Sequence, residues 1–484
     1  MSTNKKNVSQ ALGWKLLERF GVMGVQFVLQ IVLARILDPE HYGVLSLMII
    51  FTALANVFVQ SGFNTALIQN KDVTEEDYSS VFWVSLSIAA ALYGGLFFAA
   101  PVIAAFYEIP ELVAPFRVLC LMLFPGALNS IQLARVSREM DFKKVFYSNL
   151  GGIVVSGAVG IAMAYMGAGL WALVAQTLLN VLAVCFVMGF TVKWRPRLVC
   201  NFARVKVLFS FGWKLLVSNL LETLYQDISS LVIGKKYNAD MLGYYNRGKQ
   251  FPQVIISAIS GAVQSVLLPA MSAKQDEPER VKQLMRTSIT VSSYIVFPMM
   301  AGLAGVATPL VRLLLTDKWL PCVPYLQIYC FALAFQPVNA SNLQAINALG
   351  RSDIFLKLEI VKKVMGVAAL AIAVICFDSP IAIAVTTAIT VVISCFINAY
   401  PNKKLIGYSY FEQARDLLPA MLAALAMCGA VLAVGLLNIP DILILLLQVI
   451  IGVGIYVAIS IVFRLESYNV LLGMVKIILA KKKK

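Results

Sequence analysis

The chain contains a long series of apolar segments, each about as long as a helix that crosses a lipid bilayer. Such a helix needs roughly 17–25 mostly apolar residues. The segments are continuously apolar rather than alternating, and they end at Pro, Gly, Asn, Asp or charge clusters, so helices rather than barrel strands are expected. We predict fourteen spans, at residues 14–37, 43–66, 79–105, 112–134, 145–166, 169–192, 210–233, 250–272, 286–308, 323–348, 354–376, 379–400, 416–437 and 441–463. The predicted fold class is therefore an all-α polytopic membrane protein.

The composition excludes a soluble protein of this size. Of the 484 residues, 60% are hydrophobic and 13% are charged, whereas a soluble chain has about 45–50% apolar and about 25% charged residues. The predicted loops are short and leave no room for a soluble catalytic domain. The 8 Cys residues lie mostly in apolar segments, and His41 is the single histidine, which argues against a disulfide scaffold or a metal cluster. We expect no metal, no cofactor and no nucleic-acid partner.

Basic residues set the predicted orientation, because Lys and Arg are retained on the cytoplasmic side of a membrane protein. With the N-terminus inside, most of the 40 Lys and Arg residues fall in inner segments, which places both termini in the cytoplasm. The outer segments contain Arg35, Lys235, Lys236, Arg247, Lys249, Arg312 and Lys318. Four of these lie in the outer loop predicted between residues 233 and 250, which indicates a role beyond topology.

The two ends of the chain carry further membrane signals. The first span resembles an uncleaved signal anchor, because no small-residue cleavage site follows its basic start. Residues 470–479 precede four lysines at 481–484. This segment is either an interfacial helix held on anionic lipid or a solvated stop signal.

A short internal repeat predicts two related halves. The sequence GWKLL occurs at residues 13–17 and again at 212–216, and a loop glycine follows each copy, Gly43 and Gly243. The repeated unit contains six spans, an even number, so both copies enter the membrane in the same direction and are related by an axis along its normal. We predict pseudo-symmetric six-helix lobes at 1–205 and 206–402, followed by two additional helices and a basic cytoplasmic tail at 403–484.

Polar side chains recur on single faces of several spans, where they normally face a protein interior or a water-filled cavity. In span one, Lys15, Arg19, Gln26 and Gln30 project within an arc of roughly 60°. Spans two, seven and eight carry comparable faces. The candidate cavity residues are Lys15, Arg19, Gln26, Asn56, Gln60, Asn64, Arg117, Lys214, Ser218, Gln253, Gln264, Lys362 and Lys363.

Acidic residues within the spans are candidates for proton or sodium coupling. Glu222 is the deepest of them, and Asp227 and Glu18 are further candidates. Structural interpretations remain open for all these groups. Basic residues near a span end can snorkel to the interface, Glu18 can pair locally, and Asn or Gln stripes often hold helices together.

Seven sequence segments together resemble one family of membrane transporters. They are LARILDPE at 33–40 with Tyr42 and Gly43, ALIQNKDVTEE at 66–76, VFW at 81–83, WALVAQ at 171–176, WRPR at 194–197, GYYNR at 243–247 and LLLTDKWLP at 313–321. They are similar to Wzx-like polysaccharide exporters and lipid-linked oligosaccharide flippases of the multidrug/oligosaccharidyl-lipid/polysaccharide superfamily, especially the colanic-acid and teichuronic-acid exporters. The resemblance extends from about residue 8 to 460, and none of the segments is an active-site signature.

The resemblance implies a flippase of the bacterial inner (cytoplasmic) membrane that works by alternating access. Its substrate would be an undecaprenyl-pyrophosphate-linked oligosaccharide repeat unit, moved outward for surface polysaccharide biosynthesis. Lys15, Arg19 and Lys214 would then hold the anionic head group, while the Asn and Gln faces accommodate sugar. The implied partners are membrane lipids, a polysaccharide polymerase and a chain-length regulator, and the protein is expected to be a monomer.

Three alternatives differ in what the chain should contain. A drug or metabolite antiporter of the same superfamily should have a more acidic or aromatic cavity. A lipid II flippase would be essential for cell-wall growth. A membrane glycosyltransferase or polymerase usually has acidic catalytic residues in large outer loops, whereas the outer acids here, such as Glu108, Glu111 and Asp317, lie in short ones. We therefore predict a transporter and not an enzyme.

Overall fold

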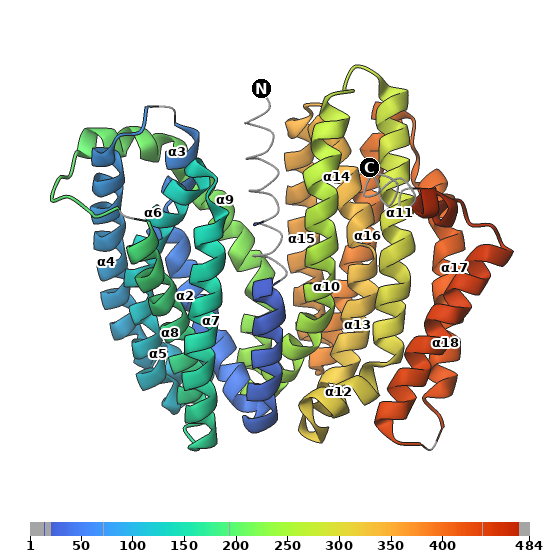
Figure 1. The fold of residues 1–484 in the computed structure, drawn as a ribbon, viewed down its shortest axis with the longest axis horizontal. Helices are drawn as coiled ribbons and strands as arrows, with labels where there is room; N and C mark the ends of the chain where they lie inside the picture. Colours follow the sequence, from blue (N-terminus) through green and yellow to red (C-terminus); the bar gives the residue numbers. More distant parts are fainter. Residues whose placement is uncertain (1–13, 15–20, 71, 193, 438, 474–484) are drawn as a thin grey trace, which may run out of the picture. The chain divides into compact units, whose positions relative to one another are not determined.

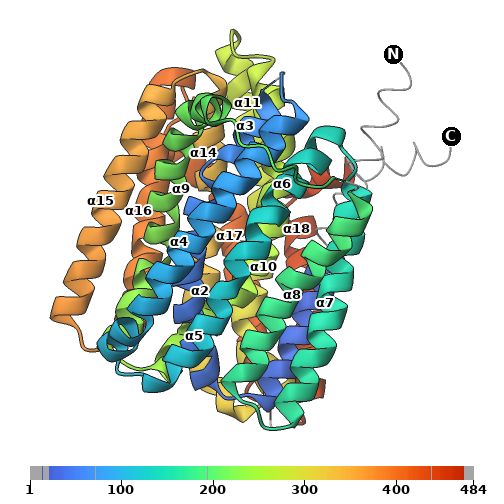
Figure 2. The same cartoon turned by 90° about the vertical axis from the view of Figure 1, so that its left-hand side faces the viewer.

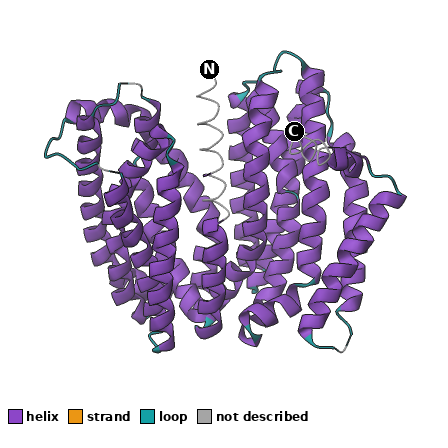
Figure 3. Ribbon diagram, in the orientation of Figure 1, coloured by secondary structure: helices purple, strands orange, loops and turns teal. Residues whose placement is uncertain are grey.

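The computed structural model describes residue 14 and residues 21–70, 72–192, 194–437 and 439–473. By their contacts the residues form two compact units, Met1–Gly243 and Tyr244–Lys484. Helices and short connections make up all of the described part (Figure 3). The lobe boundaries expected from the repeat, at residues 205 and 402, remain a prediction.

The first unit is a bundle of long helices, some of which are interrupted or bent (Figures 1 and 2). It begins with the helix Gly21–Ile36. The following elements are α2 (Pro39–Gln60), α3 (Phe63–Gln69), α4 (Glu75–Tyr107), η1 (Pro110–Leu112), α5 (Val113–Leu119), η2 (Cys120–Met122), α6 (Leu123–Glu139), α7 (Phe142–Tyr165), α8 (Leu170–Thr191) and α9 (Phe202–Lys236). Helices α7 and α8 lie side by side along their length.

The second unit begins within α10. It contains α10 (Ala239–Ser272) from residue 244 onward, then α11 (Pro278–Gly305), α12 (Ala307–Leu315), η3 (Asp317–Cys322), α13 (Val323–Ala334), α14 (Gln336–Ala348), α15 (Ser352–Cys376), α16 (Pro380–Ile406), α17 (Tyr410–Val434) and α18 (Asp441–Val462). Each unit contains a span that is interrupted by a 3₁₀ turn. This span follows α4 in the first unit and α11 in the second. Residues 466–473 form a further helical segment, and the remainder of the predicted tail helix lies outside the described residues.

Local sequence chemistry accounts for where several helices start. Thr74 and Asp77 form a reciprocal capping box at the start of α4, and Ser409 and Glu412 do the same for α17. Pro380 occupies the first turn of α16, where its missing N–H costs nothing. Nine helices in the described part are long and apolar enough to cross a membrane, or ten if the bent α9 is counted as one span. The all-α polytopic fold is therefore confirmed.

One predicted span is not continuous. Residues 43–66 were expected to form a single helix, but α2 ends at Gln60, and Ser61 and Gly62 adopt left-handed backbone conformations before α3 begins. The reason is a close backbone approach, since a Cβ atom on Gly62 would lie 2.3 Å from the carbonyl oxygen of Gly212. Asn64 therefore lies on α3, whereas Asn56 and Gln60 lie on α2, although residues 39–69 together still form one candidate membrane span.

The outer loop predicted between residues 233 and 250 is also wrong. Only residues 237 and 238 separate α9 from α10, so the basic residues of this segment are mostly helical. Arg247 is only 6% exposed. Its guanidinium carbon lies 5.1 Å from the centre of the Trp319 ring, and its Nη1 donates to Gln250 Oε1 at 2.8 Å. These contacts let the charge lie within a helix, where sequence alone suggested a loop.

The two repeated glycines, Gly43 and Gly243, were expected in loops but lie in the first turns of α2 and α10, where they mark a symmetric contact within the first unit. A Cβ atom on Gly43 would lie 1.8 Å from the carbonyl oxygen of Ala239, and one on Gly243 would lie 2.2 Å from that of Pro39. Pro39 and Ala239 are the first residues of α2 and α10, so equivalent positions of the repeat contact each other. Only glycine allows the two helix starts to approach this closely.

We expect Gly43→Ala to destabilise the protein by about 1–3 kcal/mol, because the added methyl group must displace backbone rather than a flexible side chain. Gly94→Ala in α4 is the matched control, since no described atom lies within 4 Å of its Cβ position. Alanine favours a helix by about 1 kcal/mol over glycine, so the control should be neutral or stabilising. The measurement is thermal unfolding in detergent, and equal unfolding temperatures for Gly43→Ala and the wild type would contradict the contact.

Candidate functional site

A column of polar side chains runs along the exposed side of α9. Lys214, Ser218, Glu222 and Gln226 are four residues apart in turn, and all four are exposed. Gln226 Nε2 donates to Glu222 Oε1 at 2.8 Å. At 1.5 Å per residue the column is about 18 Å long, more than half of a hydrocarbon core of about 30 Å. Sequence analysis identified the first three residues and missed Gln226, although its spacing of four was a usable signal.

Helix α10 exposes a second set of polar residues in the other unit. Gln253 and Gln264 are exposed and lie three helical turns apart on one face. Ser257 and Ser260 lie between them and are half-buried. The Ser257 hydroxyl donates to Val254 O at 3.0 Å, whereas Ser260 Oγ is buried with no hydrogen-bond partner among the described residues.

The polar residues predicted for the first two spans are less accessible. Gln26, Asn56, Gln60 and Asn64 are all half-buried. Asn56 Oδ1 is close to α6, where a Cβ atom on Gly126 would lie 3.3 Å from it. The Oδ1 atoms of Asn56 and Asn64 are buried, without a hydrogen-bond partner in the described part of the chain. Whether these four residues contact a substrate remains a prediction.

Arg117 has a structural contact inside the first unit. Its Nε donates to the carbonyl oxygen of Phe97 at 3.1 Å, and its guanidinium carbon lies 4.0 Å from the centre of the Phe97 ring. Pro101 is four residues after Phe97 in α4 and has no N–H to give to this carbonyl. Arg117 therefore donates a hydrogen bond to a carbonyl oxygen that has no donor within its own helix.

The remaining candidate cavity and coupling residues are of three kinds: one that forms an ion pair, two that are half-buried, and three that lie outside the described residues. Lys362 Nζ lies 2.6 Å from Glu359 Oε1, and the Lys362 side chain is 13% exposed, so its charge is largely compensated. Lys363 and Asp227 are half-buried and both have interaction partners. The predictions for Lys15, Glu18 and Arg19 lie outside the described residues.

Sequence analysis missed a buried amide cluster in the second unit. Asn402 Nδ2 donates to Asn342 Oδ1 at 2.8 Å, Asn342 Nδ2 donates to Gln413 Oε1 at 2.9 Å, and Asn398 Nδ2 donates to Asn339 Oδ1 at 2.8 Å. All five side chains are at least nine-tenths buried. The cluster joins α14, α16 and α17, so it holds helices together and does not line an open site.

The sequence segments that carried the family resemblance also form packing contacts. Tyr245 of the GYYNR segment stacks edge-on with Tyr325 and Tyr329, and Tyr244 does so with Trp319 of the LLLTDKWLP segment.

Ion pairs hold both ends of α4 in the first unit. Arg204 Nη2 lies 2.7 Å from Asp77 Oδ2, and Asp77 is almost fully buried. At the opposite end of α4, a hydrogen bond from Lys235 lowers the pKa of the Glu108 carboxyl below its usual range.

Metal chemistry has no candidate ligand set in the part of the chain that the structure describes, since no group of three His, Cys, Asp or Glu side chains gathers there. The fold and the exposed polar residues define a multi-pass helical membrane protein with polar surface inside its spans, an arrangement typical of transport proteins.

Comparison with known proteins identifies the family. Residues 32–324 match the family described as polysaccharide biosynthesis protein, and the chain belongs to it. The resemblance found in the sequence is thus confirmed. The chain is 24% identical over 418 residues to the succinoglycan biosynthesis transport protein ExoT of Rhizobium meliloti, covering 86% of this chain and 82% of that protein. It is 25% identical to the teichuronic acid biosynthesis protein TuaB of Bacillus subtilis, covering 73% and 74% of the two chains.

Solved structures share the fold. The lipid II flippase MurJ in an inward closed conformation matches with a TM-score of 0.75 and 16% identity, over 94% of this chain and 99% of that chain. An inward-facing multidrug resistance transporter of the MATE family matches with a TM-score of 0.60 and 14% identity, over 81% and 98%. At these identities the likeness is one of fold.

We expect the Arg117 contact to depend on Pro101. Arg117→Ala should cost about 1.5–3 kcal/mol, because it removes a charged donor from a buried carbonyl. In a Pro101→Ala background, the introduced alanine supplies an N–H to Phe97 O, so the same change should cost less. Thermal unfolding of the four proteins in detergent measures the coupling. Equal losses in both backgrounds would show that Arg117 acts elsewhere.

Proposed function

We propose that the protein is a flippase for an undecaprenyl-pyrophosphate-linked oligosaccharide repeat unit and moves it outward across the cytoplasmic membrane during surface polysaccharide biosynthesis. Membership of the polysaccharide biosynthesis family supports this substrate class. Two relatives are named for succinoglycan transport and teichuronic acid biosynthesis. The activity is transport by alternating access and not catalysis.

The exposed polar column on α9 is the observation that carries the proposal. Ionisable and amide side chains are costly against acyl chains, so a column about 18 Å long requires water or a polar ligand beside it. Hydroxyl and amide groups suit sugar hydroxyls, which both donate and accept hydrogen bonds. The exposed glutamines of α10 give the second unit a surface of the same chemistry.

Lys214 is the cation in this column best able to meet a pyrophosphate. It is exposed, and among the described residues it forms no hydrogen bond or ion pair that would compensate its charge. Lys362, in contrast, is compensated by Glu359. A lysine ammonium is a compact point charge with three donors, which suits phosphate oxygens.

The proposed orientation follows the distribution of basic residues, with both termini in the cytoplasm. Lys214 lies close to the bend of 55° that separates Phe202–Ser210 from Gly212–Lys236. In this orientation it belongs to the inner half of its span, on the side from which the lipid-linked substrate is loaded. The polysaccharide polymerase and the chain-length regulator are proposed partners, and the transporter is proposed to act as a monomer.

We expect Lys214→Ala to lower export about tenfold, the loss for one charge-assisted hydrogen bond, without lowering protein abundance. Lys214→Arg keeps the charge and should retain most of the activity. Lys404→Ala, an exposed lysine in the last turn of α16, is the control and should export normally. Surface polysaccharide and membrane protein are quantified in the same cells. Normal polymer from Lys214→Ala cells would remove this residue from the mechanism.

Glu222 is the proposed coupling residue. Glu222→Gln keeps the shape of the side chain and removes its charge, so transport should lose its dependence on the coupling gradient. The measurement is flipping in reconstituted vesicles with an imposed proton gradient or an imposed sodium gradient. Glu111→Gln, at an exposed acid in η1, serves as the control. Unchanged gradient dependence in Glu222→Gln would reject the role.

A further inference from the structure

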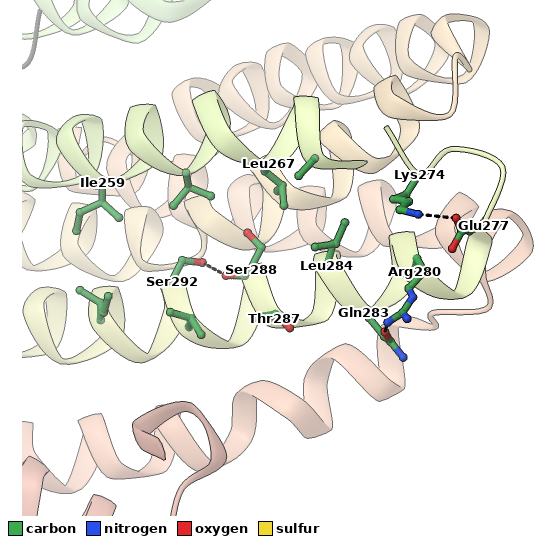
Figure 4. A pocket seen from close by; sticks show the side chains of 14 residues that line it. Ile259, Leu267, Lys274, Glu277, Arg280, Gln283, Leu284, Thr287, Ser288 and Ser292 are labelled. Carbon is green, nitrogen blue, oxygen red and sulfur yellow. Dashed lines mark hydrogen bonds and ion pairs between the residues drawn. The ribbon is translucent and has the colours of Figure 1, made fainter. Parts of the chain in front are cut away.

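A groove of about 760 Å³ lies between α10 and α11 in the second unit (Figure 4). Its volume falls within the roughly 300–1,000 Å³ typical of ligand pockets. One wall comes from α10 and the other from α11, at helical spacing. The apolar residues that line it are Ile259, Val263, Leu267, Ala270, Leu284, Val291 and Ile295.

Two of the three hydroxyl groups that line this groove are engaged by the protein, and the third is that of Thr287. Ser288 Oγ lies 3.1 Å from Ser341 Oγ on α14. Ser292 Oγ donates to the carbonyl oxygen of Ser288, one turn earlier in the same helix. Satisfied hydroxyls offer little to a sugar, so the groove presents a mainly apolar surface.

Positive charge gathers at one end of the groove. Lys274 and Arg280 line this end together with Glu277 (Figure 4). Lys274 Nζ lies 2.7 Å from Glu277 Oε1 and lowers the pKa of that carboxyl. Arg280 Nη1 donates to the neutral Gln283 Oε1 at 3.0 Å and has no ion-pair partner within the described residues. Of the charged side chains that line this end, two are therefore cations and one is an anion, while the acids Asp276 and Glu279 of the same segment do not line the groove.

Other basic residues at the start of α11 point elsewhere. Arg286 Nε lies 2.8 Å from Asp416 Oδ2, and Lys282 Nζ lies 3.4 Å from Glu412 Oε1, both on α17. Arg280 and Thr287 are two helical turns apart and share the groove face. The acids of α17 thus compensate one face of α11, while the cation on the groove face remains available.

We propose that this groove binds the polyprenyl chain of the lipid-linked substrate, with the phosphate end at Arg280 and Lys274. The proposal rests on the proposed function, because it assigns a binding place to one part of that substrate. In the proposed orientation the basic end is cytoplasmic, where the carrier lipid is loaded. The apolar walls match a hydrocarbon chain, and the net positive end matches a phosphate.

The test uses the full-length protein in vesicles of phosphatidylethanolamine and phosphatidylglycerol. Undecaprenyl phosphate that carries a diazirine is photocrosslinked, and the labelled peptides are identified by mass spectrometry. We expect label within residues 259–295, competed by unlabelled undecaprenyl phosphate. Ala270→Trp should fill the groove and abolish this label, and Arg280→Gln should weaken it about fivefold.

Matched variants separate groove occupancy from general damage. Leu268→Trp places the same ring on the adjacent exposed position of α10, outside the groove, and Lys404→Gln removes a charge from the exposed end of α16. Both should label like the wild type. Thermal unfolding in detergent reports whether Ala270→Trp is folded, and Arg280→Gln tests the site without adding bulk.

The outcomes distinguish the two proposals. Equal labelling of residues 259–295 by a diazirine-bearing phosphatidylglycerol would mean that the groove holds bulk lipid, and it would overturn the inference. Label outside this segment that persists in Ala270→Trp, with normal export, would also overturn it and leave the flippase function standing. Label in the groove without transport of a lipid-linked oligosaccharide would support the groove and overturn the proposed function.

Discussion

Hydrocarbon offers no hydrogen-bond partners, and this constraint accounts for most polar contacts inside the two units. Because Pro101 has no N–H, the carbonyl oxygen of Phe97 lacks its usual helical donor, and Arg117 on another helix supplies a hydrogen bond instead. Asn342 is fully buried, and its amide is bonded to both Asn402 and Gln413. Arg247 is buried against Trp319. In each case the partner lies within the same unit, so polar residues in these places stabilise the bundle.

The polar column on α9 differs from these cases because its side chains are exposed. Glu222 accepts a hydrogen bond from Gln226 on its own helix, and Lys214 remains accessible to an external anion. Such groups tolerate a membrane span only where water or a polar ligand lies beside them. The contrast between satisfied interior amides and an accessible column supports the proposal that the column on α9 takes part in transport.

Span length and charge were enough to predict the fold from sequence, because a continuous apolar run has few alternatives in a bilayer. The break at Gly62 was not predictable, since its cause is the backbone of Gly212, far away in sequence. For the site, helical phase placed Lys214, Ser218 and Glu222 on one face, and this face is exposed. Helical phase alone does not say whether a face points to a neighbouring helix. Asn56 and Arg117, which contact neighbouring helices, were therefore predicted as cavity residues together with the exposed Lys214 and Ser218.

The accessible cations differ in the chemistry that surrounds them. Lys214 lies among hydroxyl, carboxylate and amide groups, whereas Arg280 lies at the end of a mainly apolar groove whose two serine hydroxyls are already bonded. A lipid-linked glycan contains sugar, phosphate and hydrocarbon, and no single surface suits both sugar and hydrocarbon. The proposed roles follow this chemistry, since the polar column suits sugar and phosphate and the apolar groove suits hydrocarbon that ends in a phosphate.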